Sequence, residues 1–260
     1  MDRRKFLNTV SATAAASIAG ATSFSAKADA LEEAMEEALE PKRRAKSSFC
    51  TIGEERERSP NDNRPYYQHN DPALPEMSKA PTLMDFYKLR FSTNHVTQSA
   101  RLALLSGSSE KVVMACLLHD IGLNIRGTDH GYWCAQLVRP YVDEEVAWAI
   151  EKHQALRFLP DLEVDYEYPE AYIRLFGADY EPEPYIMEEA KKARNHKWYM
   201  SSREITINDV YAFDPSLTVD VEDFTDIMGR NFKQPKEGLG FDGSPVAHMW
   251  RTFIWPTNFL

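Results

Sequence analysis

An apolar run that ends in an adjacent histidine and aspartate limits how this chain can fold. The seven residues from Val112 to Leu118 are all apolar, which predicts a buried helix. His119 and Asp120 follow directly, and an unpaired aspartate is costly to bury. A metal ion would remove that cost, because imidazole and carboxylate groups are common metal ligands. The sequence therefore predicts a metal site at the end of this helix.

Other segments also show apolar residues at helical spacing, and no strand pattern competes with them. Ser109 is expected to open the helix that ends before His119, and Asp129 to cap a helix that stops at Pro140. With 260 residues, 43% of them hydrophobic, the chain is long enough for one sizeable core. We predict an all-α bundle of helices of about ten residues each. The predicted helices cover residues 94–105, 112–118, 130–138, 143–153, 182–200 and 221–232, whereas residues 204–213 are less clear.

The N-terminal residues are expected to form an export signal. Arg3, Arg4 and Lys5 precede a mildly apolar stretch, and Ala26-Lys27-Ala28 supplies a cleavage site of the small-x-small type. We interpret residues 1–28 as a twin-arginine signal peptide. It predicts a periplasmic or exported protein that uses the twin-arginine export machinery and has no stable membrane insertion.

The rest of the chain is expected to divide into three parts. Residues 29–81 would form a surface helix and an irregular arm, residues 82–232 the helical core, and residues 233–260 an extended tail that packs on the core. The net charge of −10, without a basic block, argues against a nucleic-acid partner. Cys116 and Cys134 lie in apolar runs and are expected to be buried thiols.

Four of the seven histidines fall at the ends of predicted helices. His95 lies near the start of one helix, His119 ends the next, His130 begins a third and His153 ends a fourth. Helix ends cluster at one end of a bundle, so these side chains can converge with Asp120 on a metal.

The order His95, His119-Asp120 and a distant aspartate resembles the signature of HD-domain proteins, and the resemblance covers residues 85–215. It implies an HD-domain helical bundle and a metal-dependent enzyme, which in most members is a phosphohydrolase. His130, His153 and the segment through Leu159 are similar to one branch of this superfamily, the mixed-valence diiron oxygenases. That branch includes the myo-inositol oxygenase and organophosphonate oxygenase types.

By this resemblance the protein holds two iron ions in the Fe(II)/Fe(III) state. A carboxylate has two oxygens and can span two metals, whereas an imidazole binds only one. Asp120 is therefore the implied bridge. The implied ligands are His95, His119, Asp120 and Asp209 for one iron, and His130, His153 and Asp120 for the other.

The last aspartate ligand has three candidates. We favour Asp209, because Ile207-Asn208-Asp209-Val210-Tyr211 resembles the Asp-Leu-Tyr context of the inositol oxygenase ligand. Asp214 precedes a proline and is expected to start a turn. Asp179, in a Gly-Ala-Asp-Tyr loop, is the other alternative.

The resemblance implies O2-dependent hydroxylation and cleavage of a C–P or C–C bond in a small, hydroxylated, anionic, phosphonate-like substrate. Asp120, Arg157 and Tyr87 are the implied catalytic residues. Arg157 would hold the anionic end of the substrate, and an exposed arginine at a helix end is the alternative. Tyr87 would also contact the substrate, although the glutamate that accompanies such a tyrosine in phosphonate oxygenases is missing. His248 is expected to be structural, with substrate contact as the alternative.

Two other classes of function fit the same residues. A phosphohydrolase would use Mn, Zn or Mg to activate water against a phosphate ester or anhydride. A non-catalytic HD-fold protein would hold the metal for regulation. The presence of all six candidate ligands favours an enzyme over the non-catalytic class.

Overall fold

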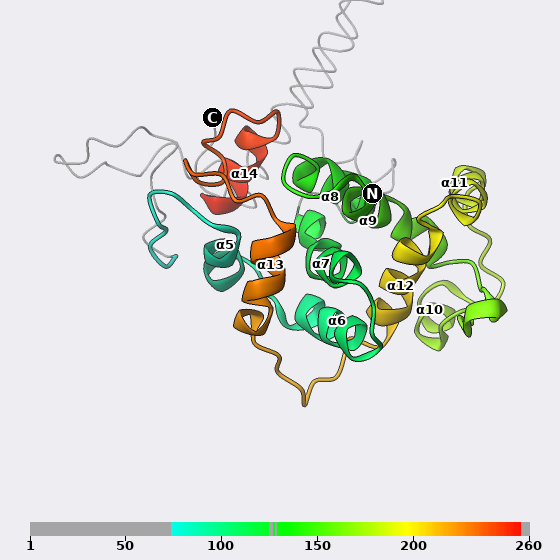
Figure 1. Cartoon of the computed structure of the whole chain (residues 1–260). Helices are drawn as coiled ribbons and strands as arrows, with labels where there is room; N and C mark the ends of the chain where they lie inside the picture. The colour runs from blue at the N-terminus through cyan, green and yellow to red at the C-terminus, as the bar shows by residue number, and fades with distance from the viewer. Residues whose placement is uncertain (1–73, 125–126, 128, 256–260) are drawn as a thin grey trace, which may run out of the picture. The chain divides into compact units, whose positions relative to one another are not determined.

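The computed structural model describes residues 74–124, 127 and 129–255, and these residues form ten α-helices and no β-strand (Figure 1). The predicted signal peptide, the predicted helix after it and the end of the predicted tail lie outside the described residues, so they remain predictions. None of the described helices is long and apolar enough to cross a membrane. The helices are α5 (Leu83–Arg90), α6 (Asn94–Leu105), α7 (Glu110–Leu118), α8 (His130–Val138), α9 (Glu144–Leu156), α10 (Glu170–Phe176), α11 (Pro184–Arg194), α12 (Tyr199–Val210), α13 (Thr225–Asn231) and α14 (Ala247–Ile254).

Four helices form the centre of the bundle. α6 packs on α7, α7 on α9, α9 on α12, and α12 back on α6. α7 lies deepest, since every residue from Val112 to Leu118 is buried, as the apolar run predicted. Cys116 and Cys134 are buried free thiols, also as predicted. The prediction of an all-α bundle is confirmed for the part of the chain that the structure describes.

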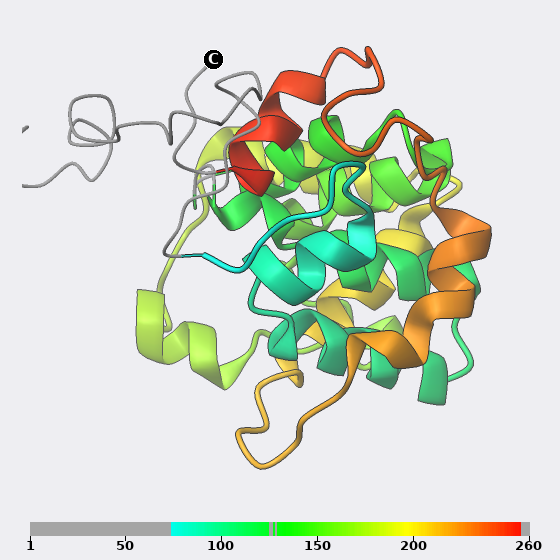
Figure 2. The same cartoon turned by 90° about the vertical axis from the view of Figure 1, so that its left-hand side faces the viewer.

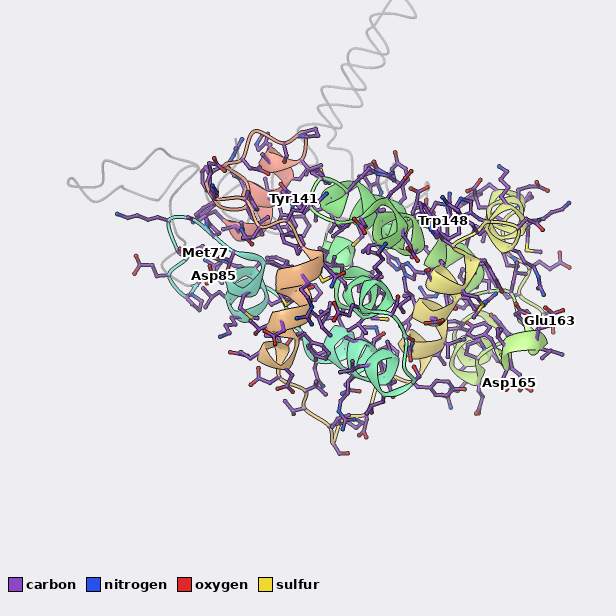
Figure 3. All side chains as sticks on the ribbon, viewed as in Figure 1. Met77, Asp85, Tyr141, Trp148, Glu163 and Asp165 are labelled. Carbon is purple, nitrogen blue, oxygen red and sulfur yellow. The ribbon has the colours of Figure 1, made fainter. Side chains whose placement is uncertain are left out.

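Two predicted helices differ from the structure. The single helix expected over residues 182–200 is wrong, because α11 ends at Arg194 and α12 begins at Tyr199. The turn between them stacks His196 on Trp148 at 4.1 Å between ring centroids (Figure 3 labels Trp148). The helix expected over residues 221–232 is a short 3-10 helix, η4 (Val221–Phe224), followed by α13.

The starts of α5 and α7 show the side-chain caps that local capping rules expect, whereas the start of α8 does not. Thr82 and Asp85 form a capping box at α5, and the side chain of Ser109 accepts a hydrogen bond from the backbone of Val112 at α7. Asp129 precedes α8, but its side chain makes no cap. Its backbone is left-handed, with φ of 53°, and its carboxylate accepts a hydrogen bond from Tyr185 instead. Asp129 therefore occupies the predicted N-cap position, but its side chain does not cap the helix.

The C-terminal segments add to the same hydrophobic core. Figure 2 turns the side with α5, α13 and α14 toward the viewer. Trp250 of α14 is fully buried and donates a hydrogen bond from its indole to the Leu137 carbonyl at 3.1 Å. Tyr141, labelled in Figure 3, stacks on Phe232 and meets the edge of Trp250. Burying large aromatic side chains in this way fixes the C-terminal segments against α8 and α5.

Candidate metal centre

Five helices bring four histidines and two aspartates to one place. α6 supplies a histidine from its first turn and α8 one from its first residue, while α9 supplies one from its last turn. A histidine and an aspartate follow α7 directly, and the second aspartate lies at the end of α12. We call these six residues the His/Asp cluster: His95, His119, Asp120, His130, His153 and Asp209.

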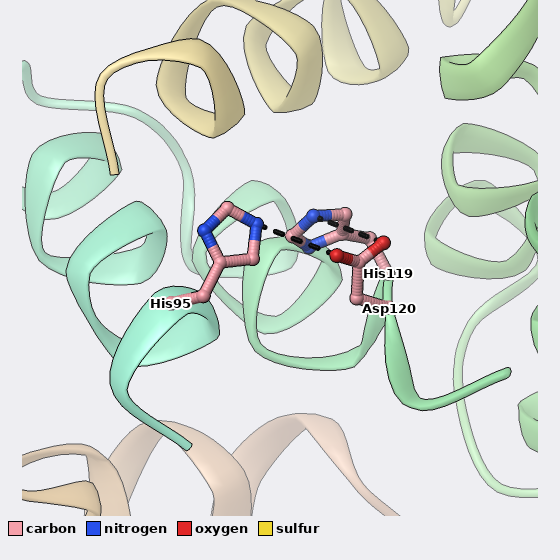
Figure 4. Close-up of side chains that lie close together, drawn as sticks. All are labelled: His95, His119 and Asp120. Carbon is pink, nitrogen blue, oxygen red and sulfur yellow. Dashed lines mark ion pairs between the residues drawn. The ribbon is translucent and has the colours of Figure 1, made fainter. Parts of the chain in front are cut away.

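One half of the His/Asp cluster lies between α6, α7 and α12. The Nε2 atom of His95 lies 3.0 Å from Oδ1 of Asp209 and 3.4 Å from Oδ2 of Asp120. The Nε2 atom of His119 lies 3.5 Å from Oδ1 of Asp120 and 3.7 Å from Oδ1 of Asp209. Figure 4 draws the contacts of His95 and His119 with the Asp120 carboxylate.

The other half lies between α8 and α9 and shares Asp120 with the first. The Nε2 atom of His130 lies 3.3 Å from Oδ1 of Asp120 and 3.2 Å from Nε2 of His153. His95, His119 and Asp120 form one group whose ligand atoms all lie within 4.8 Å of one another, and Asp120, His130 and His153 form a second. One carboxylate therefore stands between two pairs of histidines.

Backbone carbonyls orient all four imidazole rings in the same sense. Each ring has its Nδ1 atom within hydrogen-bond distance of a carbonyl oxygen, so Nδ1 carries a proton and Nε2 is the nitrogen that points into the cluster. This is the arrangement in which histidine binds a metal through Nε2. The contacts are His95 to Ala212 at 3.0 Å, His119 to Cys116 at 2.8 Å, His130 to Gly127 at 3.0 Å and His153 to Ile150 at 2.6 Å.

The inward-facing nitrogens fit a cation. The Nε2 atoms of His130 and His153 face each other across 3.2 Å while both Nδ1 atoms contact carbonyls, so the two Nε2 atoms would share either one proton or a metal ion. The buried Nε2 atoms of His95 and His119 have no hydrogen-bond partner in the described part of the chain, although carboxylates lie nearby. Buried polar atoms without partners are costly, and metal coordination would satisfy them.

The electrostatics of the cluster favour ionised carboxylates and hold protons on two of the histidines. Burial would lower the pKa values of His95 and His119, but Asp120 and Asp209 raise both, that of His95 to about 10, so a metal would displace a proton from each ring. Burial alone would raise the pKa of Asp209, but His119 and His95 hold it well below its usual range. His119 and His130 likewise hold down the pKa of Asp120 against the effect of burial. Both carboxylates are therefore ionised. Burial, reinforced by His130, lowers the pKa of His153, so that ring is neutral, as a metal ligand must be.

The cluster opens to solvent on one side. His119 and His153 are fully buried, and Asp209 is 3% exposed. The side chains of His95 and Asp120 are 20% and 15% exposed. A small molecule would therefore approach the centre past His95 and Asp120.

Arg157 lies beside the cluster. It follows α9, four residues after His153, and its Nη2 atom lies 3.8 Å from Oδ2 of Asp209. Its Nε and Nη2 atoms donate hydrogen bonds to the Tyr172 hydroxyl at 2.9 and 2.6 Å. The side chain is only 22% exposed, so the alternative of a solvent-exposed arginine does not hold.

The structure places the other predicted site residues away from the cluster. Tyr87 is 1% exposed, and its hydroxyl donates to the Leu117 carbonyl at 2.7 Å, so it packs behind α7 rather than facing a substrate. His248 is exposed on α14. Asp214 and Asp179 are exposed, whereas Asp209 lies in the cluster. Of the three candidates for the last ligand, the geometry favours Asp209.

A cavity of about 520 Å³ lies next to the cluster, between α8, α9 and α11, but no cluster residue lines it. Two of its carboxylates are already paired, since Lys152 lies 2.8 Å from Glu151 and 2.7 Å from Glu189. The cavity therefore offers few unpaired charged groups, and we place the chemistry at the cluster. The aromatic residues of the cavity wall are Tyr132, Trp133 and Tyr185.

Comparison with protein-family models agrees with a metal site at the His/Asp cluster. A comparison with curated proteins finds no match to this chain. Residues 93–194 match the family model of the HD domain, a stretch that holds five of the six cluster residues and ends before Asp209. The helical fold and the His/Asp cluster agree with this match to the HD domain, a family whose members are generally metal-dependent enzymes.

Proposed function

We propose that this protein is an O2-dependent diiron oxygenase that hydroxylates and cleaves a C–P or C–C bond in a small, hydroxylated, anionic substrate. The observation that carries the proposal is the group formed by Asp120, His130 and His153. Two histidines and one carboxylate with open coordination positions are typical of non-haem Fe(II) oxygenases. This donor set favours iron and O2 over the hydrolytic alternative.

The position of Asp120 supports two metal ions rather than one. Its Oδ2 atom faces His95, while its Oδ1 atom faces His119 and His130, so this carboxylate would be a ligand of both ions. Asp209 adds a second carboxylate on the His95 side only. The ion on that side would carry more negative ligand charge, which favours its higher oxidation state. Bound iron would supply the one-electron redox chemistry and the open positions for substrate and O2.

Arg157 supports an anionic substrate. Its guanidinium group is held by the Tyr172 hydroxyl and the Tyr172 ring, whose centroid lies 4.8 Å away. A guanidinium fixed in advance loses little freedom when it binds a carboxylate or phosphonate group. Asp209 alone cannot neutralise Arg157, because that carboxylate also faces the histidines. We therefore assign Arg157 the role of holding the anionic end of the substrate next to the metals.

The proposal is tested by metal analysis, electron paramagnetic resonance and O2 consumption on aerobically purified protein. We expect about two irons per chain, because the two ligand groups share Asp120. We expect a mixed-valence signal below g = 2, and O2 uptake with one member of a panel of phosphonates, inositols and other polyols. Phosphate release that needs Zn, Mn or Mg and continues without O2 would replace the proposal with the hydrolytic function.

A matched pair of histidine variants tests the ligand set. His130→Ala removes one ligand of the His130/His153 group, so we expect it to lose one of two irons while the fold persists. His196→Ala is the control, because that histidine stacks on Trp148 outside the cluster. It should keep both irons. Equal iron content in the two variants would show that the ligand assignment is wrong.

A further inference from the structure

We infer that Gln98 is a positioning residue for the candidate ligand His95, because it anchors the segment whose backbone and side chain orient the His95 ring. The inference rests on the proposed metal centre and assigns a role to a residue outside it. The anchored segment covers residues 211–217, which follow α12 directly. We call it the post-α12 segment.

His95 depends on a distant partner in a way that the other three histidines do not. His119, His130 and His153 each contact a carbonyl three residues earlier in the chain, so the local turn sets their ring orientation. The partner of His95 is the Ala212 carbonyl, 117 residues away. The orientation of His95 is therefore correct only if the post-α12 segment lies in the right place.

Gln98 holds that segment with all of its hydrogen-bonding groups. Its Oε1 atom accepts a hydrogen bond from the Asp214 backbone at 3.0 Å. Its Nε2 atom donates to the carbonyls of Asp214 and Leu217, both at 2.8 Å. Gln98 is 2% exposed and lies three residues after His95 on α6, so both side chains project from nearby positions on the same face. A buried amide that is satisfied by backbone groups in this way fixes their position.

The anchored segment contacts His95 on its edge and on its face. Ala212 is 1% exposed and accepts the Nδ1 hydrogen bond at the ring edge. The Phe213 ring stacks on the imidazole at 4.3 Å between centroids, with 18° between the planes. Phe213 is itself 68% exposed, so little packing fixes its ring. Its position depends mainly on the backbone that Gln98 anchors. Because His95 is partly exposed, these two contacts replace the packing that surrounds the buried histidines.

The same segment is joined to Asp209. The Ala212 backbone N–H donates to the Asp209 carbonyl at 3.1 Å, which closes the end of α12. A displacement of the segment would therefore disturb the two candidate ligands that face each other at 3.0 Å, His95 and Asp209. Gln98 acts on one half of the His/Asp cluster and leaves the His130/His153 group unaffected.

The experiment is an anaerobic Fe(II) titration of Gln98→Met, which keeps the side-chain size and removes the amide. Loss of a group that orients a ligand typically weakens metal binding about 10–100-fold. We expect this loss at one of two iron sites, with the other unchanged. Gln234→Met is the matched control, because Gln234 also accepts from one backbone N–H, that of Leu83, and donates to two carbonyls, those of Pro81 and Pro235. It should bind both irons as wild type does.

A second variant keeps the test decisive if Gln98→Met does not fold. Phe213→Ala removes an exposed ring and spares the core, and it should weaken the same iron site by about 3–10-fold, a smaller loss than that of an orienting hydrogen bond. Wild-type affinity for both irons in the folded variants would overturn the inference and leave the proposed centre standing. A wild-type protein that binds no iron would overturn both.

Discussion

At the scale of single residues, the burial and the orientation of the side chain decide which aspartate can bind a metal. Asp209 and Asp214 lie five residues apart, and the sequence offers both as candidates for the last aspartate ligand. Asp209 is 3% exposed and faces two histidines, while Asp214 is exposed and its carboxylate accepts hydrogen bonds from the backbone and hydroxyl of Ser216. An aspartate that caps its own turn is not available as a ligand.

Asparagine substitutions at these two positions should give different results. Asp209→Asn removes a charge between His95 and His119, so we expect loss of the iron on that side, with at least a ~10-fold drop in activity. Asp214→Asn keeps an oxygen for the Ser216 contacts and should bind iron like wild type. Iron content and O2 uptake of both variants check this. Loss of iron in Asp214→Asn alone would move the last ligand to Asp214.

The sequence predicted the cluster residues but not the residues that orient them. His95, His119, His130 and His153 could be found because each lies at the end of a helix with a clear apolar period. Gln98 and the Ala212 carbonyl could not be found, since their link to His95 spans more than a hundred residues and a carbonyl has no sequence signal. The contact of Arg157 with Tyr172 is likewise tertiary.

At the scale of helices, amphipathic spacing predicted the helices that have one polar face. It did not predict α12. Polar residues of α12 are buried beside apolar ones, because the helix lies in the centre of the bundle: Ser202, Arg203, Thr206 and Asp209 are all buried. The Arg203 guanidinium donates hydrogen bonds to the Tyr199 hydroxyl and the Leu156 carbonyl, so these N–H groups are satisfied inside the core. The short helix α5 was also missed, although Thr82 and Asp85 have the spacing of a capping box.

A glycine sets the distance between α8 and α9 and thereby that between His130 and His153. A Cβ atom on Gly131 would lie 2.9 Å from the Ile150 carbonyl and 3.2 Å from Cε1 of His153. Gly131→Ala should therefore push the two helices apart, destabilise the fold by about 1–3 kcal/mol and weaken iron binding at this pair. Thermal unfolding and iron content measure both effects.

Gly229 of α13 supplies the control for this substitution. A Cβ atom there would meet nothing within 4 Å. Gly229→Ala should stabilise the helix by about 0.5–1 kcal/mol and leave iron binding unchanged. If Gly131→Ala behaved in the same way, the close approach of α8 and α9 would not control the centre.

At the scale of the whole molecule, the centre joins α12 to the consecutive helices α6 to α9, from which α10 and α11 separate it along the chain. α6, α7, α8, α9 and α12 each present a cluster residue at one of their ends. Without a metal, two ionised carboxylates would depend on the protons of His95 and His119 in a mostly buried space. A bound metal would therefore stabilise the packing of these helices as well as supply chemistry.

Removal of the metal should lower the thermal stability of the whole bundle. A ligand that binds only the folded state at 100 times its Kd stabilises it by about 2.7 kcal/mol, which corresponds to about 5–10 °C in Tm for a chain of this size. We expect chelation of wild-type protein to lower Tm by that amount for each iron lost. On chelation, the Tm of His130→Ala, which keeps one iron at most, should fall by about half as much as that of wild type. The Tm of Asp214→Asn should fall by the full amount. A wild-type Tm that chelation leaves unchanged would mean that the helices pack without help from the cluster, and that the metal contributes to chemistry alone.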